Sequence, residues 1–343
     1  MKKILLAVFQ AAVAAVAVHA VVLALRGDGR EAPAPALDEQ AGRIRAVEVH
    51  YAPGSAFAIR TYVEFFRQLP ADVTVYVAVE KKEHFEEFVR LTGREAIPLV
   101  IGKPITTWAR DRFIACADGS VVIPPEPKDV GAERRNDRLV PFALARETGA
   151  TTRIAPFIFD GGDFCAAYGK IFCSSTWVAR NPGRPLDELL RLAEGTFGMP
   201  VVYLPVAPRH HVGMVFAPVG GRRFLVGDVR WGRRLAPSGF DADLTEETAR
   251  AFDAVAEELA AAGFDVSRVP ALPTTTEFAW VTYTNGIFED RTVWMPSFGI
   301  AAIDAAAAEV YRGLGFDVRP VDVSGDFRHG GTLHCLVHVV KRG

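Results

Sequence analysis

The sequence predicts an α/β fold built from a repeated module. Short apolar segments with the alternation of β-strands are followed by amphipathic segments with helical spacing, and this order recurs roughly every 50 residues. Half of the 343 residues are hydrophobic, which is enough to bury a sizeable core. The glycine doublets at 161–162 and 220–221 are too short for a phosphate-binding motif. The repetition favours one domain of similar modules, although a simple α/β sandwich would fit the pattern nearly as well.

The first module shows the pattern clearly. Residues 72–79 (DVTVYVAV) alternate in the manner of a half-buried strand. Residues 81–92 then place Phe85 and Phe88 on one side, as an amphipathic helix does. A short apolar strand is expected next, at residues 98–101.

The later modules repeat this order. Residues 185–196 carry leucines at helical spacing, and residues 201–204 follow as a strand. The longest helix is expected at residues 244–262, where Thr245 can cap the start and Gly263 ends the helix. The remaining expected elements are a strand at 293–296, a helix at 303–314, and strands at 317–321 and 333–340.

The N-terminal region predicts export from the cytoplasm. Lys2 and Lys3 precede an apolar segment at residues 4–25, so residues 1–26 are expected to be a signal peptide or signal anchor. The basic pair indicates that the body of the protein is exported across the cytoplasmic membrane, to be secreted or membrane-anchored. Residues 27–42 are proline-rich and are expected to be a disordered linker. A single folded domain is then expected at residues 43–343.

The charge and the cysteines exclude several classes of protein. A net charge of −2 gives no electrostatic reason to expect nucleic acid as a partner. The basic residues between 222 and 234 are expected to form a solvated face. Four cysteines are too few for a disulfide scaffold, and no CxxC pair indicates zinc. Cys165 and Cys173 could face each other across a hairpin, but two buried free thiols are the preferred interpretation.

Four polar segments interrupt the apolar pattern. Cys335 follows a glycine-rich turn at the expected entrance of the last strand, where glycine permits tight turns and the close approach of a ligand. A thiol nucleophile needs an acid–base partner, which either His211 or His210 could supply. The segments are 108–114 (WARDRFI), 159–164 (FDGGDF), 209–214 (RHHVGM) and 330–335 (GGTLHC).

Carboxylates in two of these segments could complete a catalytic site. Asp160 or Asp163 is suited to orient the histidine, and Asp111 is suited to hold a cationic substrate. Each residue also has an ordinary alternative. Arg110 and Asp111 could be a structural ion pair, the DGGD segment a turn, and Cys335 an inert buried thiol. Only the combination of the segments favours a site.

Further motifs accompany these segments, namely RNP at 180–182, TYTN at 282–285 and MPSFG at 295–299. With the WxRD motif at 108–111 and the glycine-rich His-Cys ending, they resemble the guanidine-modifying (pentein) superfamily in the same order. The likeness is to the agmatine deiminase and bacterial peptidylarginine deiminase branch, and it covers nearly all of residues 43–343. It implies a five-bladed α/β propeller of ββαβ-like units around a central polar channel.

The resemblance also implies a covalent mechanism that uses no metal and no organic cofactor. Cys335 would attack the guanidinium carbon, His211 would act as acid and base, and Asp160 would orient His211. The substrate would be a small-molecule or peptidyl guanidino compound, and a membrane would be contacted only through residues 4–25. The residues implied in substrate binding are Asp111, Trp108, Arg110, Asp163 and Asn285.

Two positions depart from the pattern of that branch. Gly213 stands where an Asp usually forms a second contact with the guanidinium group, and Asp160 stands where Glu is common. Both features resemble dimethylargininases, and a glycine is expected to open space for an N-alkylated guanidine. The sequence therefore predicts a deiminase acting on arginine, peptidyl-arginine or an agmatine-like substrate. The alternatives are a degenerate pentein that binds a cation without turnover, and a dimethylargininase-like or amidinotransferase variant.

Overall fold

A computed structural model describes residues 32–126, 130–276 and 278–343. The expected signal segment and the first part of the expected linker, up to residue 31, lie outside the described residues. No helix within the described ranges is both long and apolar enough to cross a membrane.

The segment at residues 34–42 belongs to the folded unit, which begins at Ala34. The backbone N–H groups of Ala36, Leu37 and Glu39 donate hydrogen bonds to carbonyl groups of three different parts of the fold, at 3.2, 2.8 and 2.9 Å. Ala36 is also buried. The prediction of a disordered linker up to residue 42 is therefore wrong for this stretch. Proline-rich composition indicates extended backbone, but it cannot show that sheet edges supply the missing hydrogen-bond partners.

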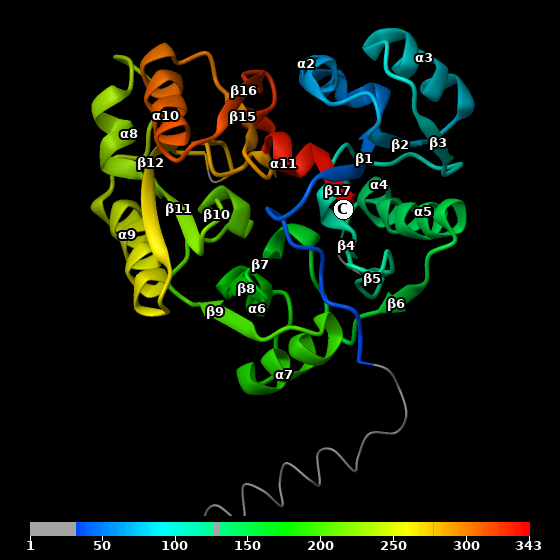
Figure 1. The fold of residues 1–343 in the computed structure, drawn as a ribbon, viewed down its shortest axis with the longest axis horizontal. Coiled ribbons are helices and arrows are strands. Elements are labelled where there is room, and N and C mark those ends of the chain that lie inside the picture. Colours follow the sequence, from blue (N-terminus) through cyan, green and yellow to red (C-terminus); the bar gives the residue numbers. More distant parts are fainter. Residues whose placement is uncertain (1–31, 127–129, 277) are drawn as a thin grey trace, which may run out of the picture. The chain divides into compact units, whose positions relative to one another are not determined.

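The described residues form five sheets, which follow one another around the middle of the folded unit (Figure 1). The first sheet joins the two ends of the domain. Its strands are β17 (Val337–Arg342), β1 (Ile44–Tyr51), β2 (Thr74–Val79) and β3 (Ile97–Val100), with helices α2 (Ile59–Gln68) and α3 (Lys82–Thr92).

The next two sheets have three strands each. One contains β4 (Ile114–Ala115), β5 (Val121–Ile123) and β6 (Thr152–Ile154), with helices α4 (Ala132–Asn136) and α5 (Val140–Thr148). The other contains β7 (Phe164–Ala167), β8 (Lys170–Ser174) and β9 (Val201–Leu204), with helices α6 (Ser175–Ala179) and α7 (Leu186–Phe197).

The last two sheets complete the circuit. One contains β10 (Phe216–Pro218), β11 (Arg223–Asp228), β12 (Asp265–Pro273) and β13 (Trp280–Thr282), with helices α8 (Val229–Leu235) and α9 (Glu246–Ala261). The other contains β14 (Ile287–Glu289), β15 (Thr292–Ser297) and β16 (Asp317–Asp322), with helix α10 (Ala301–Gly313).

All five sheets share one connection pattern. An antiparallel pair, such as β7 and β8, is followed by a helical crossover to a parallel neighbour, such as β9. The same order holds for the sheets that begin with β4, β10, β14 and β17. The ββαβ-like repeat expected from the resemblance is therefore confirmed. The pairing of β17 with β1 joins the end of the chain to the first sheet.

One predicted element is wrong in part. The apolar stretch at 333–340 was expected to be a single strand, but Leu333–Leu336 form a helical turn, α11, and only Val337–Arg342 extend as β17. Leu333 and Leu336 are both fully buried at helical spacing. A short apolar run fits a buried helix as well as a strand, so periodicity could not separate the two.

The hairpin of β7 and β8 decides the state of two cysteines. Its register pairs Cys165 with Phe172 and Cys173 with Phe164, so the two cysteines lie on opposite faces of the sheet. Both are buried free thiols, and burial raises the pKa of each. The alternative of a disulfide between them is therefore wrong.

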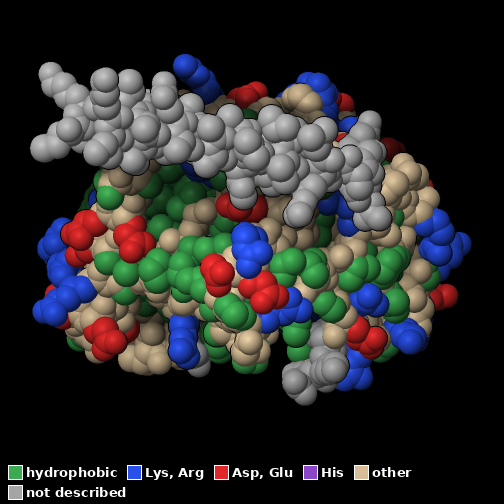
Figure 2. All heavy atoms as spheres, turned by 90° about the horizontal axis from the view of Figure 1, so that it is seen from below, with side chains coloured by type: hydrophobic (Ala, Val, Ile, Leu, Met, Phe, Trp, Pro, Cys, Tyr) green, Lys and Arg blue, Asp and Glu red, His purple; other side chains and the backbone are tan. Residues whose placement is uncertain are grey.

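The basic cluster near residue 230 lies among acidic partners at the surface. Arg223 contacts Asp265 at 3.4 Å, and Arg230 contacts Glu246 at 2.8 Å. On the face shown in Figure 2, basic and acidic side chains are likewise interspersed among neutral ones. The expectation of a solvated face is confirmed for Arg222, Arg223, Arg230 and Arg234, whereas the side chain of Arg233 is only 12% exposed.

Candidate active site

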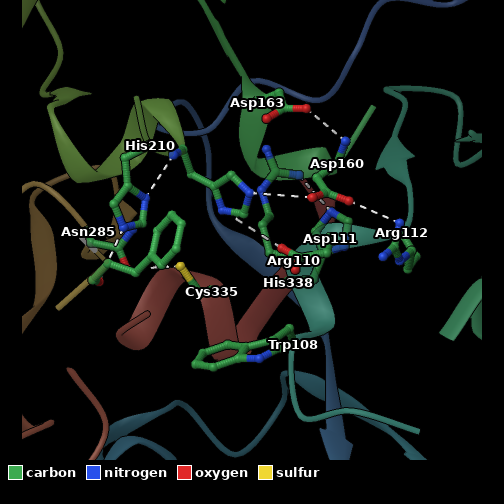
Figure 3. Close-up of polar contacts among 12 residues, drawn as sticks. Trp108, Arg110, Asp111, Arg112, Asp160, Asp163, His210, Asn285, Cys335 and His338 are labelled. Atoms are coloured by element: carbon green, nitrogen blue, oxygen red, sulfur yellow. Dashed lines mark hydrogen bonds and ion pairs between the residues drawn. The ribbon is translucent and has the colours of Figure 1, made fainter. Parts of the chain in front are cut away.

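The site residues occupy equivalent turns of the repeated units. Asp111 ends a 3₁₀ turn (Ala109–Asp111) shortly before β4, and Asp160 caps a second turn (Gly161–Asp163) that leads into β7. His211 directly precedes a third turn (Val212–Met214) before β10, and Cys335 lies in α11, directly before β17. Since each turn precedes the first strand of its sheet, the ring of sheets brings four distant segments together (Figures 1 and 3).

These side chains line one cavity of about 640 Å³. This volume lies within the range of ordinary small-molecule sites. The cavity combines acidic, basic and aromatic groups, and Cys335 lies at its wall although it is only 3% exposed. The lining residues are Thr106, Trp108, Asp111, Arg134, Asp160, Thr176, Ala179, Arg180, Arg209, His210, His211, Phe278, His329, Gly330 and Cys335.

Cys335 is held in α11 by close packing beneath it. A Cβ atom at Gly331 would lie 2.6 Å from the ring of Trp108 and 3.0 Å from the Cβ atom of Cys335, so only glycine fits. The thiol donates a weak hydrogen bond to Oδ1 of Asn285 at 3.6 Å, and the hydroxyl of Thr332 donates to the same oxygen at 2.6 Å. The glycine-rich segment therefore sets the position of the thiol.

His211 lies between two carboxylates. Its Nδ1 is 3.9 Å from Oδ1 of Asp111, and its Nε2 is 3.8 Å from Oδ2 of Asp160. These distances are those of ion pairs and are too long for hydrogen bonds. Burial alone would lower the pKa of His211, but Asp111, Asp160 and Cys335 together raise it well above its usual value. The imidazole therefore carries a proton at neutral pH.

The close approach of His211 requires a glycine on the neighbouring turn. A Cβ atom at Gly162 would lie 2.4 Å from Nδ1 of His211, which is a clash. His210 points elsewhere: its Nδ1 accepts a hydrogen bond from the backbone N–H of His211 at 2.8 Å, and its ring packs on Trp280. Burial and His211 lower the pKa of His210 to about 3. Of the two candidate histidines, only His211 contacts the carboxylates.

Asp160 receives three guanidinium groups. Arg112 contacts its Oδ1 at 3.0 Å, while Arg134 and Arg180 contact its Oδ2 at 2.9 and 2.7 Å. Burial would raise the pKa of Asp160, but His211 and the three arginines hold it far below its usual range. Asp160 is therefore ionised throughout the physiological pH range.

Three residues that the sequence assigned to substrate binding do not line the cavity. Arg110 forms an ion pair with Glu39 and contacts His338, and neither Arg110 nor His338 lines the cavity. Asp163 is fully buried and accepts the backbone N–H of Asp160 at 2.8 Å, so it shapes the turn. Asn285 lies beside the thiol and is 1% exposed. Trp108 and Asp111 do line the cavity.

The expectation that Gly213 opens space is wrong. A Cβ atom there would lie 3.3 Å from Nδ2 of Asn285 and 3.4 Å from Nδ1 of His334, and Gly213 does not line the cavity. His334 is itself held by Glu39, 3.1 Å away. The volume beside Gly213 is therefore filled by protein.

Sequence reasoning missed the arginines of the site. Arg134 lies on α4, in a segment with no recognisable motif, and Arg180 was noted only as part of the RNP motif. Arg112 lies within the WARDR segment, where its charge was the only available signal. Glu39 was placed in the linker. None of these positions could be assigned without knowing which loops meet.

Asp111, Asp160 and His211 also have the arrangement of a metal site. One ligand atom from each lies within 4.8 Å of the others. The carboxylates, however, already contact Arg134, and Asp160 also contacts Arg112 and Arg180. A metal ion bound there would have to displace guanidinium groups, so this donor set fits a metal poorly.

Comparisons with known proteins identify the fold. No protein family model matches the sequence, and a search of curated proteins found no significant match. The agmatine deiminase of C. jejuni is similar in structure, with a TM-score of 0.72 at 17% identity over 90% of this chain and 96% of that chain. The chain has the fold of the penteins.

Two further penteins extend this likeness. The agmatine deiminase of Enterococcus faecalis has a TM-score of 0.67 at 14% identity, over 89% of this chain and 96% of that chain. A structure described as a proposed peptidyl-arginine deiminase has a TM-score of 0.70 at 15% identity, over 90% and 99% of the two chains. The expected pentein architecture is therefore confirmed at the level of the fold.

Proposed function

We propose that the chain is a hydrolase that breaks a C–N bond of a guanidino group through a covalent intermediate on Cys335. The observation that carries this proposal is the meeting of a thiol, a protonated histidine and two carboxylates in one cavity. Known proteins of the same fold include agmatine deiminases. The cavity volume is suited to a substrate of that size.

In the proposed first half-reaction, the Cys335 thiolate attacks the guanidinium carbon and forms a C–S bond. Asp111 holds the guanidinium nitrogens by charge-assisted hydrogen bonds. His211 then donates its proton to the departing nitrogen, so that ammonia leaves and an S-linked thiouronium remains. The raised pKa of His211 suits this step, because the ring is protonated at neutral pH.

In the second half-reaction, water attacks the same carbon and His211 accepts the proton of that water. The C–S bond then breaks and the remaining hydroxyl proton passes through solvent to the released ammonia, which leaves a urea derivative, an ammonium ion and the Cys335 thiolate. The balance is one guanidinium and one water converted into one urea derivative and one ammonium ion. Asp160 positions His211 between the two steps through its ion pair.

The test is to incubate the full chain with arginine, agmatine, methylated arginines and an arginyl peptide, and to measure ureas, ammonia and alkylamines. Ammonia release from the first two supports a deiminase, whereas alkylamine release supports a dimethylargininase-like variant. The absence of any product, together with a Cys335 that does not react with a haloacetamidine, would falsify the enzyme proposal.

A second candidate is a protein that binds a guanidinium without turnover. Gly213 favours it, because the usual second carboxylate is missing and protein atoms fill the space. The 3.8 and 3.9 Å distances around His211 also leave the acid–base residue without a hydrogen-bonded carboxylate. Measurable binding without product in the same experiment would favour this candidate.

A further inference from the structure

Arg134 holds the two carboxylates of the cavity in the way that a substrate guanidinium would. Its Nη1 lies 2.6 Å from Oδ2 of Asp111, and its Nη2 lies 2.9 Å from Oδ2 of Asp160. Both carboxylate side chains are 4% exposed, whereas the Arg134 side chain is 26% exposed and lines the cavity. Two N–H groups on two buried carboxylates form a strong, geometrically specific contact.

The two carboxylates depend on Arg134 to different degrees. Asp160 keeps Arg112 and Arg180 as partners if Arg134 leaves. Asp111 has Arg134 as its only guanidinium partner within the described part of the chain, and otherwise lies 3.9 Å from His211. Its Oδ1 atom is buried and has no hydrogen-bond partner among the described residues. Asp111 is therefore the carboxylate at which an incoming cation can replace Arg134.

A second guanidinium cannot take the position at Oδ2 of Asp111 while Arg134 remains there. The position at Oδ2 of Asp111 is filled, and two cations side by side in a partly buried site repel each other. When a substrate guanidinium replaces Arg134, Asp111 loses one cationic partner and gains another, so no buried carboxylate is left unpaired. The ligand must displace Arg134 to bind, however, and its apparent affinity for the site is therefore reduced.

We propose that Arg134 is the affinity-determining residue of this site, since its guanidinium occupies the place of the substrate guanidinium at Asp111 and must be exchanged for it. The inference rests on the proposed function, because it assumes that the ligand is a guanidinium. If Arg134 fills the position in about 90–99% of molecules, the apparent dissociation constant is raised about 10- to 100-fold. Removal of the Arg134 guanidinium removes this competition.

The test uses full-length chains that carry Cys335→Ala, so that nothing is turned over, and measures the binding of agmatine and arginine by calorimetry. Arg134→Gln should lower the dissociation constant of either ligand about 10- to 100-fold. Arg135→Gln is the matched control, because Arg135 lies on the same helix, is exposed and forms no ion pair among the described residues, and its side chain donates a hydrogen bond to the carbonyl of Val130 at 3.3 Å. The Arg135→Gln chain should bind either ligand with the same dissociation constant as the parent chain.

A thermal-shift measurement separates competition from a purely structural role. Without ligand, Arg134→Gln should melt at a lower temperature than the parent, because Asp111 loses its cation. With saturating agmatine it should gain more stability than the parent gains. Lower stability without tighter binding would mean that Arg134 only supports the fold, and that result would overturn the inference.

The remaining outcomes are also decisive. Should Arg134→Gln fail to fold, Arg134→Met serves instead, because an unbranched apolar side chain keeps the packing of the arginine stem and removes the competing cation. Arg134→Met should then bind agmatine more tightly than the parent, and equal or weaker binding overturns the inference. Binding to the parent that is not improved by either variant overturns the inference and leaves the proposed function standing. No binding to any folded variant overturns both.

Discussion

Two polar clusters with similar residue types meet at α11. Each cluster includes one of two consecutive residues of this helical turn, His334 and Cys335. Cys335 faces the open cluster, which consists of Asp111, Asp160, His211, Arg134 and Cys335. His334 faces the closed cluster, which consists of Glu39, Arg110, His334 and His338. Each cluster combines carboxylate, guanidinium and imidazole groups, but the open cluster lines a cavity of about 640 Å³ and the closed cluster one of about 30 Å³.

The difference shows that residue types do not define a catalytic site. A cavity of about 30 Å³ holds roughly one water molecule, so no molecule of substrate size can reach the charges of the closed cluster. In the open cluster the same kinds of groups meet a space large enough for a substrate. We therefore expect the closed cluster to govern stability and the open cluster to govern activity.

The largest effect on activity is expected for substitution of Cys335, the thiol of the open cluster, and not for substitution of a cysteine outside the site. Cys335→Ala should reduce product formation from the best guanidine substrate by at least about 1000-fold, because the nucleophile is lost. Cys173→Ala, at a fully buried position outside the site, should retain activity in the molecules that fold. Ammonia release measures both. Full activity in Cys335→Ala would show that the open cluster does not govern activity.

The closed cluster should show the opposite behaviour. Glu39→Gln leaves Arg110, whose side chain is 7% exposed, without its carboxylate partner. Breaking such a buried pair typically costs about 3–5 kcal/mol of the free energy of unfolding. Urea unfolding measures this cost, while kcat should stay within a few-fold of the parent value. Glu309→Gln, which breaks an exposed pair with Arg312, serves as the control and should change stability little.

The pH dependence of stability should report the same pair. Burial alone would raise the pKa of Glu39, but Arg110, His334 and Arg342 lower it from 4.5 to about 2. Since the folded-state pKa is the lower one, the stabilisation is complete above pH 4.5 and is lost as the pH falls toward 2. This shift corresponds to about 3 kcal/mol of the free energy of unfolding. Unfolding curves between pH 5 and 2 should show a shallower decline in Glu39→Gln than in the parent.

The smallest expected effect concerns the carboxylate that holds the substrate. Asp111→Asn should lower kcat/KM about 10- to 100-fold, since one charge-assisted contact is worth about 1.5–3 kcal/mol. The free energy of unfolding should fall less than in Glu39→Gln, because Arg134 keeps Asp160 as a partner. A stability loss as large as that of Glu39→Gln would show that Asp111 belongs functionally with the closed cluster.

The sequence by itself determined the repeated module, the helices and most strands, because periodicity and capping are local properties of the chain. It also singled out Cys335, His211, Asp160 and Asp111, since their residue types and order match a known chemistry. It placed Glu39 in a linker and extended the last strand through Cys335, because neither sheet edges nor burial can be read from composition.

Only the tertiary structure decided which charges share a cavity. Arg110 and Asp111 are neighbours in the chain, yet Arg110 belongs to the closed cluster and Asp111 to the open one. Arg134 carries no motif, and it reaches Asp111 and Asp160 only because the turns before β4 and β7 meet beside α4. Contacts between distant segments depend on how the five sheets close on one another, and this is a property of the packed ring rather than of any single segment.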